Sequence, residues 1–209
     1  MNEGIVRKDV QMNADVITTI LTGCLVVAGL LILISIVLYS WRNGISPMPS
    51  PIESRAAVAA ELQRLGPYGT LLEAGSGWGS LAFYLARNCP GWRVTGVENS
   101  TVPYACAWLR LGVVSFLLSW GLPSRPDQSL GKRLVFRRAD LYEWPLEQTD
   151  VVVCYLYPAA MKRLSGLFHE RLLPGATIIS VCFALPDWQP ERVIVCRDIQ
   201  RTRVYVYRA

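Results

Sequence analysis

An apolar segment that ends in an acid and runs into closely spaced glycines constrains the fold of this chain more than any other feature. The segment from Thr70 to Ser80 reads TLLEAGSGWGS, with glycines at positions 75, 77 and 79. Glycine adopts left-handed backbone conformations, and it allows a close approach to the backbone, without steric cost. The pattern predicts a short buried strand, a tight loop and a helix, with a ligand against the loop.

Strand-like and helix-like segments alternate around this loop. Strands are predicted over 70–75, 92–98, 133–140, 150–157 and 176–185, and helices over 52–65, 79–89, 101–120 and 159–172. The last two apolar segments, 191–198 and 202–208, are typical of an antiparallel pair. We therefore predict an α/β fold: a doubly wound, mostly parallel sheet of the Rossmann-like type with an antiparallel C-terminal strand pair.

A second feature is the uncharged apolar run over 16–41. A helix of about 20 apolar residues spans the hydrocarbon core of a bilayer. A cleaved signal peptide is the main alternative, but the run is long for one, and YSWRNG follows it in place of a small-residue cleavage site. We expect a short tail over 1–15, a single transmembrane helix over 16–41, a linker over 42–51 that contains Pro47, Pro49 and Pro51, and one domain over 52–209.

The charge pattern and the cysteine and histidine content indicate neither a nucleic-acid partner nor a metal site. The net charge is +5, but the basic residues are scattered rather than gathered in a stripe, so we expect no nucleic-acid partner. The six cysteines form no CxxC pair and His169 is the one histidine, so we expect no metal site. Most of the cysteines lie in apolar runs, which predicts small buried side chains.

The segment 111–120, LGVVSFLLSW, is apolar almost all round. It is too short to span a bilayer. Its composition fits either a fully buried helix or a helix that lies against the membrane. The residues after it, 121–132, are expected to form a loop.

The residues around the glycine loop indicate a nucleoside with a cationic group. Glu98 ends the second strand, where a carboxylate can accept hydrogen bonds from two ribose hydroxyls. The glycine spacing is G-x-G-x-G rather than the dinucleotide G-x-G-x-x-G, and Ser80 takes the place of a third glycine. Glu73 is poorly placed beside a pyrophosphate but suits a ligand that carries an ammonium group.

These motifs resemble those of the class I S-adenosylmethionine-dependent methyltransferases. The similarity runs through EAGSGWG, VTGVENS, FRRADLYEW and DVVVCYLYP, and covers about residues 51–209. It implies S-adenosylmethionine as the cofactor. It further implies that Glu73 and the loop of Gly75, Gly77 and Gly79 hold the methionine moiety, that Glu98 holds the ribose, and that Asp140 with the Leu141 backbone holds the adenine. The alternative for Asp140 is a turn or helix-cap acid.

A narrower resemblance concerns the whole chain. The N-terminal span, SPMPSP, GSGWG and FALPDWQP together resemble the membrane-anchored lysine methyltransferases of ATP synthase subunit c or the adenine nucleotide translocase, and their bacterial relatives. The chain departs from that subgroup at Trp78, in the aromatic CYLYP and in a longer 111–133 region. These departures leave the methyl acceptor open.

Three functions follow from this reading. The first is methyl transfer to a lysine of a membrane protein, with Tyr155, Tyr157 and Asp187 expected at the substrate mouth. In this reading Tyr155 and Tyr157 lie on one face of the fourth strand, while Asp187 with Trp188 has a simple turn as its alternative. The second is methylation of a quinone or isoprenoid, and the third is a non-catalytic cofactor-binding protein. Because S-adenosylmethionine is made in the cytosol, we expect the domain on the cytoplasmic side, in a bacterial inner membrane.

Overall fold

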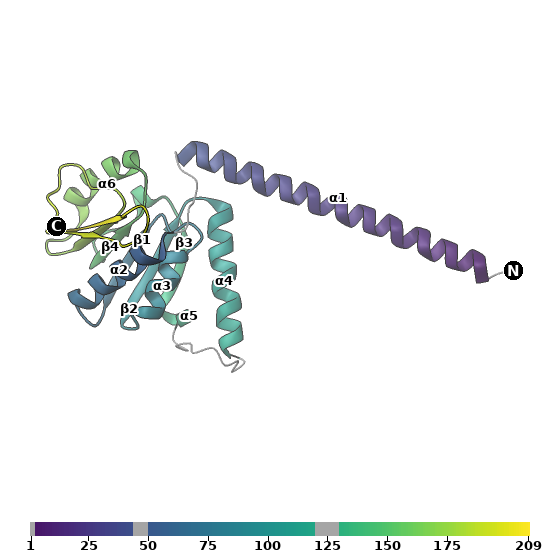
Figure 1. Cartoon of the computed structure of the whole chain (residues 1–209), viewed down its shortest axis with the longest axis horizontal. Helices are drawn as coiled ribbons and strands as arrows, with labels where there is room; N and C mark the ends of the chain where they lie inside the picture. The colour runs from purple at the N-terminus through teal and green to yellow at the C-terminus, as the bar shows by residue number, and fades with distance from the viewer. Residues whose placement is uncertain (1–2, 44–49, 120–129) are drawn as a thin grey trace. The chain divides into compact units, whose positions relative to one another are not determined.

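The computed structural model describes residues 3–43, 50–119 and 130–209, with side chains described over 15–38, 50–117 and 130–209. The chain divides into two compact units, Met1–Ser46 and Pro47–Ala209. The first contains one long helix and the second an α/β domain (Figure 1). The predicted linker prolines Pro47 and Pro49 lie outside the described residues.

The first unit is the helix α1, Glu3–Asn43. Within it, Asp15–Leu38 has a mean hydropathy of 2.9 and is long and apolar enough to cross a membrane. The hydroxyl groups of Thr19 and Thr22 each donate a hydrogen bond of 2.8 Å to the carbonyl four residues earlier. Each hydroxyl donor is therefore satisfied within the helix, as a hydrocarbon environment requires. The helix also includes most of the segment that the sequence analysis assigned to an N-terminal tail.

The second unit is built on one seven-stranded sheet of order β3-β2-β1-β4-β5-β7-β6. Its strands are β1 Gly69–Ala74, β2 Trp92–Glu98, β3 Leu134–Arg138, β4 Val151–Cys154, β5 Thr177–Val181, β6 Arg192–Val195 and β7 Arg203–Arg208. The first five are parallel, whereas β7 pairs antiparallel with both β5 and β6. This confirms the predicted doubly wound sheet with its antiparallel C-terminal pair.

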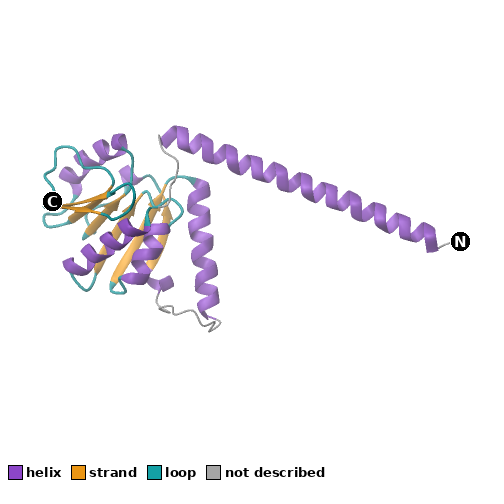
Figure 2. Ribbon diagram, in the orientation of Figure 1, coloured by secondary structure: helices purple, strands orange, loops and turns teal. Residues whose placement is uncertain are grey.

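Helices cover both faces of the sheet (Figure 2). They are α2 Ile52–Leu65, α3 Ser80–Asn88, α4 Thr101–Ser119, the short α5 Leu130–Arg133 and α6 Pro158–Arg171, with a 3-10 turn η1 at Leu141–Glu143. Residues of α2, α3, α4 and α5 share one buried cluster with the sheet, whereas residues of α6 belong to the other cluster. Successive strand residues alternate between the two clusters: Leu71 belongs to the first and Leu72 to the second.

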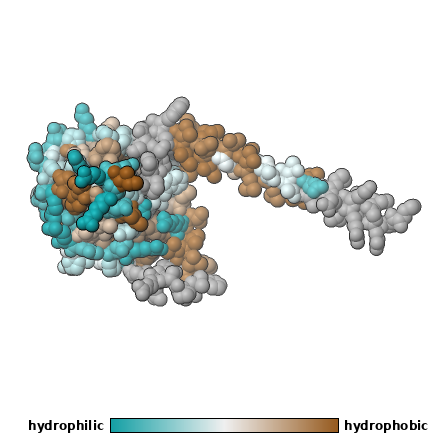
Figure 3. Space-filling view, in the orientation of Figure 1, coloured by the Kyte–Doolittle hydropathy of each residue, from teal (hydrophilic) through white to brown (hydrophobic). Residues whose placement is uncertain are grey.

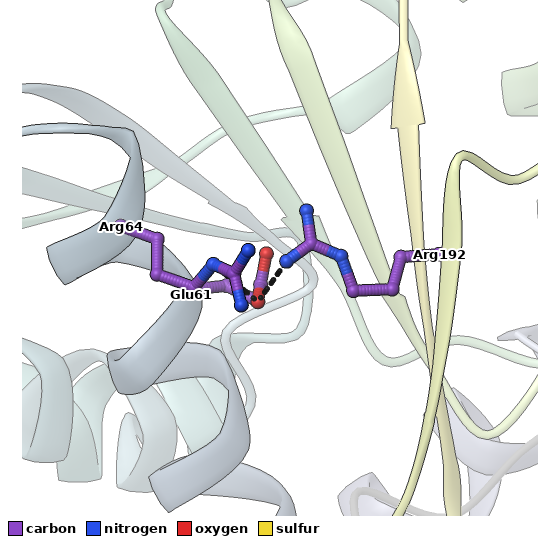
Figure 4. Close-up of polar contacts among 3 residues, drawn as sticks. All are labelled: Glu61, Arg64 and Arg192. Atoms are coloured by element: carbon purple, nitrogen blue, oxygen red, sulfur yellow. Dashed lines mark hydrogen bonds and ion pairs between the residues drawn. The ribbon is translucent and has the colours of Figure 1, made fainter.

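A buried acid connects α2 to the far edge of the sheet (Figure 4). Glu61 is 3% exposed, and its Oε1 lies 3.1 Å from the guanidinium of Arg192 in β6 and 3.8 Å from that of Arg64. A buried carboxylate without a partner would be strongly destabilising. The contact therefore orients α2 relative to the C-terminal strand pair.

Two sequence-based expectations need correction, and one open alternative is decided. The predicted loop over 121–132 ends in the helix α5, and its residues 121–129 lie outside the described part of the chain. Of the two alternatives left open for the segment 111–120, full burial is not met, since Val113 and Phe116 are 50% and 58% exposed. Cys89, Cys154 and Cys196 are buried as predicted, but Cys24, Cys106 and Cys182 are exposed.

Candidate cofactor site

The carboxyl ends of four parallel strands meet at one edge of the sheet. The register pairs Ala74 with Val97 on one side and with Cys154 on the other, and it pairs Glu98 with Arg138. β1 lies between β2 and β4, so the strand order reverses beside it. Ligands of doubly wound sheets bind in the crevice at such a switch point. The glycine loop follows β1 directly and so lies at this position.

The glycine loop has an unusual backbone, which explains its composition. Gly75, Gly77 and Gly79 have φ angles of 74°, 51° and 75°, all in the left-handed region. A Cβ atom on Gly75 would lie 2.5 Å from Cδ2 of Leu156, and one on Gly79 would lie 2.6 Å from Cζ of Phe136. At these two glycines a side chain would be strained by the left-handed backbone and would also displace Leu156 or Phe136.

Glu98 connects the loop to the start of α4. Its Oε2 accepts a hydrogen bond of 2.8 Å from the Gly77 N–H, and its Oε1 accepts one of 2.8 Å from the Ser100 N–H. Each carboxylate oxygen can accept a further bond. Glu98 can therefore shape the loop and still receive two hydroxyl groups of a ribose.

Glu73 lies beneath the loop, on the α3 side of the sheet. It is 5% exposed, and its Oε2 accepts a hydrogen bond of 3.0 Å from Ala82 N–H in the first turn of α3. Burial raises its pKa to about 8, the nearby charge of Glu98 adds to the rise, and the Ala82 bond and the charge of Arg55 oppose it. A cationic ligand nearby would favour the ionised form. Glu73 thus holds a proton near neutral pH and would give it up to pair with a positive charge placed beside it.

Asp140 and Leu141 follow β3 at the same edge. The side chain of Asp140 caps η1, with Oδ1 accepting a hydrogen bond of 2.9 Å from the Tyr142 N–H. The cap alternative considered for this acid is therefore realised, and the exposed carboxylate has a second oxygen for a ligand. Leu141 packs against the α6-side cluster.

Tyr155 and Tyr157 do not lie in the fourth strand, as the sequence analysis expected, because β4 ends at Cys154. Tyr155 packs against the α2-side cluster, and its pKa is raised by burial and by the charges of Cys182 and Asp198. Tyr157 is the N-cap residue of α6 and lies close enough to Tyr142 to contribute to the raised pKa of that phenol. The two side chains therefore meet different neighbours beyond the strand end.

Asp187 and Trp188 lie in the loop after β5. Asp187 is exposed and has a φ of 64°. The indole of Trp188 stacks on His169 of α6 with ring centroids 4.1 Å apart, and its N–H lies 3.4 Å from the Ser165 carbonyl oxygen. This is the geometry of the turn alternative, with Trp188 held against α6.

Sequence reasoning missed three residues of this edge. Leu156 packs against Gly75, Ser100 donates its N–H to Glu98, and the charge of Arg55 acts on Glu73. A signal existed for Ser100, because an acid just before a helix is well placed to accept its first N–H groups. Nothing in the sequence indicated the effect of Arg55 on Glu73 or the contact of Leu156 with Gly75.

The arrangement fits S-adenosylmethionine. The left-handed loop carries no side chains at its three glycines, Glu98 retains acceptor capacity for a ribose, and the buried carboxyl of Glu73 could ionise to pair with a cationic group. Among the residues that the structure describes, no three His, Cys, Asp or Glu side chains are grouped so as to hold a metal ion. The site thus offers hydrogen-bond acceptors and a closely packed loop.

Comparisons with known proteins agree with this geometry. The family model described as the ANTKMT methyltransferase domain matches residues 73–192. The fold is similar to that of an RNA methyltransferase from Salinibacter ruber in complex with S-adenosyl-L-homocysteine, with 24% identity, a TM-score of 0.62, and coverage of 77% of this chain and 93% of that one.

A second similar structure is a SAM-dependent methyltransferase from Thiobacillus denitrificans, also with S-adenosyl-L-homocysteine, at 20% identity, TM-score 0.50, and coverage of 69% of this chain and 54% of that one. The pyocyanin biosynthetic protein PhzM has 15% identity, TM-score 0.52, and coverage of 72% and 53%. No curated protein matches the chain. Because the family match extends across the cofactor edge and most of the sheet, this chain belongs to the ANTKMT methyltransferase domain family and is an S-adenosylmethionine-dependent methyltransferase.

Proposed function

We propose that this methyltransferase is anchored in a membrane through α1 and methylates a lysine of a membrane protein. The observation that carries the proposal is the apolar helix Asp15–Leu38 in the same chain as the catalytic domain. A tether raises the effective concentration of substrates in the same membrane. The resemblance of the motifs to membrane-anchored lysine methyltransferases agrees with this substrate class.

The proposed site residues position the cofactor and the nucleophile and keep water away from them. When bound, S-adenosylmethionine supplies a methyl group on a positively charged sulfur. In the proposed assignment, Glu98 orients the ribose, Asp140 and the Leu141 backbone hold the adenine, and Glu73 with the glycine loop holds the methionine end. Displacement at such a centre needs an aligned, desolvated nucleophile more than a strong base.

A lysine nucleophile must lose its proton before it can attack. Burial disfavours charged amines and lowers their pKa. Burial is the largest cause of the raised pKa of both Glu73 and Tyr155, so an amine buried beside them would lose hydration as well, whereas a nearby ionised acid would act in the opposite direction. Tyr155, Tyr157 and Asp187 are kept as the proposed substrate-side residues.

The proposed orientation places the domain in the cytoplasm, at a bacterial inner membrane. S-adenosylmethionine is made in the cytosol. The sequence supports it mildly, because Arg42, Arg55 and Arg64 follow the span whereas Arg7 and Lys8 precede it. Protease added outside intact cells should leave the domain uncut, and digestion of the domain would overturn this orientation.

The substrate class is tested with methyl-labelled S-adenosylmethionine and membranes from cells that lack the protein. We expect label in a discrete protein band with the native enzyme, and mass spectrometry of that band should find methylated lysine. Glu98→Ala should lose the band, because it removes the ribose acceptor and the Gly77 contact. Label that appears only in the organic extract would replace the lysine proposal with a quinone or isoprenoid acceptor.

Asp150→Ala is the matched control for Glu98→Ala. The Oδ2 of Asp150 accepts hydrogen bonds from the Thr70 N–H at 2.7 Å and the Thr70 hydroxyl at 2.8 Å, at the opposite end of β1. Both substitutions remove a carboxylate with two hydrogen bonds, but only Glu98 lies at the cofactor edge. Equal loss of label in both variants would mean that general destabilisation, rather than cofactor binding, explains the result.

A further inference from the structure

We propose that the exposed apolar side of α4 is a second membrane contact, which lays the catalytic domain on an anionic lipid surface. The surface, here called the α4 outer face, consists of Ala105, Trp108, Leu109, Gly112, Val113 and Phe116. The proposal rests on the proposed membrane anchor and adds a contact made by the domain itself.

The α4 outer face follows a helical stripe. Its members recur at spacings of three and four residues, which place them on one side of a helix. Trp108 and Leu109 are each 60% exposed, and Val113 and Phe116 are 50% and 58% exposed. The opposite side of the helix packs on the domain through Ala107, with Leu111 and Val114 against the same cluster. Figure 3 shows the resulting hydrophobic colouring along α4.

The one charged residue of α4 does not interrupt the stripe. The guanidinium of Arg110 lies over the ring of Phe83 in α3, 4.3 Å from its centroid. The charge is thus directed to the neighbouring helix. A soluble domain seldom exposes a contiguous apolar surface of this kind without a partner for it.

Several elements around α4 are basic, whereas β2, which also lies beside it, ends at Glu98. The elements α3, α4, α5 and β3 contain no Asp or Glu. Their basic residues are Arg87, Arg110, Lys132, Arg133, Arg137 and Arg138. α5 lies beside α4, since a Cβ on Gly131 would be 2.8 Å from Oγ of Ser115. An apolar helix face that contains Trp and Phe, with basic residues next to it, is the pattern that binds at an anionic membrane interface.

The chain itself supports lipid as the occupant. The candidate span ends at Leu38 and α2 begins at Ile52, so even a fully extended chain would hold the domain within about 50 Å of the membrane. A lipid surface is therefore always within reach. A second copy of the chain would present the same basic elements, and like charges would oppose that pairing.

The test places a fluorophore on the α4 outer face of the full chain. The exposed cysteines are removed by Cys24→Ala, Cys106→Ala and Cys182→Ala, and an environment-sensitive label is attached at Leu109→Cys. The matched control carries the label at Ile199→Cys, which is fully exposed in the turn between β6 and β7. Each chain is placed singly in a lipid nanodisc, and lipids with brominated acyl chains serve as the quencher.

We expect a several-fold loss of fluorescence at position 109 and little loss at position 199, with the loss at 109 greater when phosphatidylglycerol is present. Val113→Glu should abolish most of the quenching, whereas Val193→Glu, an exposed valine on β6, should not. An unquenched label at 109 in chains that remain in the disc would overturn the α4 contact and leave the anchor intact. Chains that do not remain in the disc would overturn both. Burial of the label at 109 that appears only in vesicles holding several chains, and not in nanodiscs holding one chain, would assign the face to a second copy.

Discussion

Glu98 belongs to the glycine-loop edge and Ala105, seven residues later, to the α4 outer face, yet these two regions are built in opposite ways. At the loop edge the two acids are bonded within the domain: Glu98 to Gly77 and Ser100, and Glu73 to Ala82. On the outer face of α4, large apolar side chains such as Trp108 and Leu109 are mostly exposed.

The difference shows that one region is fixed by contacts inside the domain and the other is left free for a partner. The loop edge is held in shape by internal contacts, so a substitution there changes the stability of the domain as well as its ligand. The α4 outer face contributes little to internal packing, so a substitution there should change only what the domain binds. Each prediction below tests one side of this contrast.

The largest effect is expected from Gly75→Ala. A left-handed φ of 74° costs a residue with a Cβ roughly 1–2 kcal/mol, and the clash with Leu156 adds about 1–3 kcal/mol. Denaturant unfolding in detergent should report a lower free energy of unfolding, and calorimetry should report lost cofactor binding. Adding Leu156→Ala to the Gly75→Ala protein should restore only the part of the unfolding free energy that the clash removed. A stable Gly75→Ala protein that binds the cofactor normally would show that the loop is not held by this contact.

Glu73→Gln should remove a pH dependence of stability of the order of a few kcal/mol. The folded-state pKa is raised from 4.5 to about 8, so the native state holds a proton that the unfolded state has lost between these values. The native protein should therefore lose stability as the pH rises from 4.5 through 8, while the variant changes less. Unfolding midpoints across this pH range provide the measurement, and parallel curves for the two proteins would contradict the assignment.

The same carboxyl predicts proton release when the cofactor binds. If the ammonium group lies near Glu73, binding at pH 7 lowers the pKa of Glu73 and releases up to about one proton. Calorimetry in buffers of different ionisation enthalpy measures that number. Glu73→Gln is the control, and equal proton release in both proteins would place the ammonium elsewhere.

Asp140 allows the cap and the ligand role to be separated. Asp140→Ala should cost about 1 kcal/mol of stability, because it removes the N-cap of η1, whereas Asp140→Asn should keep the cap. Both variants should bind the cofactor at least about tenfold more weakly, which corresponds to roughly 1.4 kcal/mol. Normal affinity in Asp140→Asn would leave this acid as a cap alone.

The smallest effect is expected on the α4 outer face. Leu109→Ala should change the free energy of unfolding by less than about 0.5 kcal/mol, since the side chain is 60% exposed. Leu164→Ala is the matched control in α6, where the side chain is fully buried and the loss should be about 2–5 kcal/mol. Similar losses in the two variants, measured in detergent, would show that the outer face contributes to internal packing after all.

Several elements could be predicted closely from the sequence. The helix over 52–65 and the strand over 92–98 have the predicted bounds, because Pro51 and Gly66 delimit the helix and Gly91 and the acid Glu98 delimit the strand. The fourth strand was predicted too long, since Tyr155 and Tyr157 are as compatible with a strand as the valines before them. Local propensity does not show where pairing with a neighbouring strand stops.

The sequence by itself determined the α/β class, the cofactor family and the candidate span, because these depend on periodicity, on the glycine loop and on an uncharged apolar run. Only the tertiary structure decided which atoms Glu98 and Glu73 bond, which side chain packs against Gly75, and which side of α4 is left exposed. A helix as apolar as α4 has no continuous polar face to mark its outside. Its exposed side is therefore set by the packing of the sheet and its neighbouring helices, which the order of residues along the chain does not display.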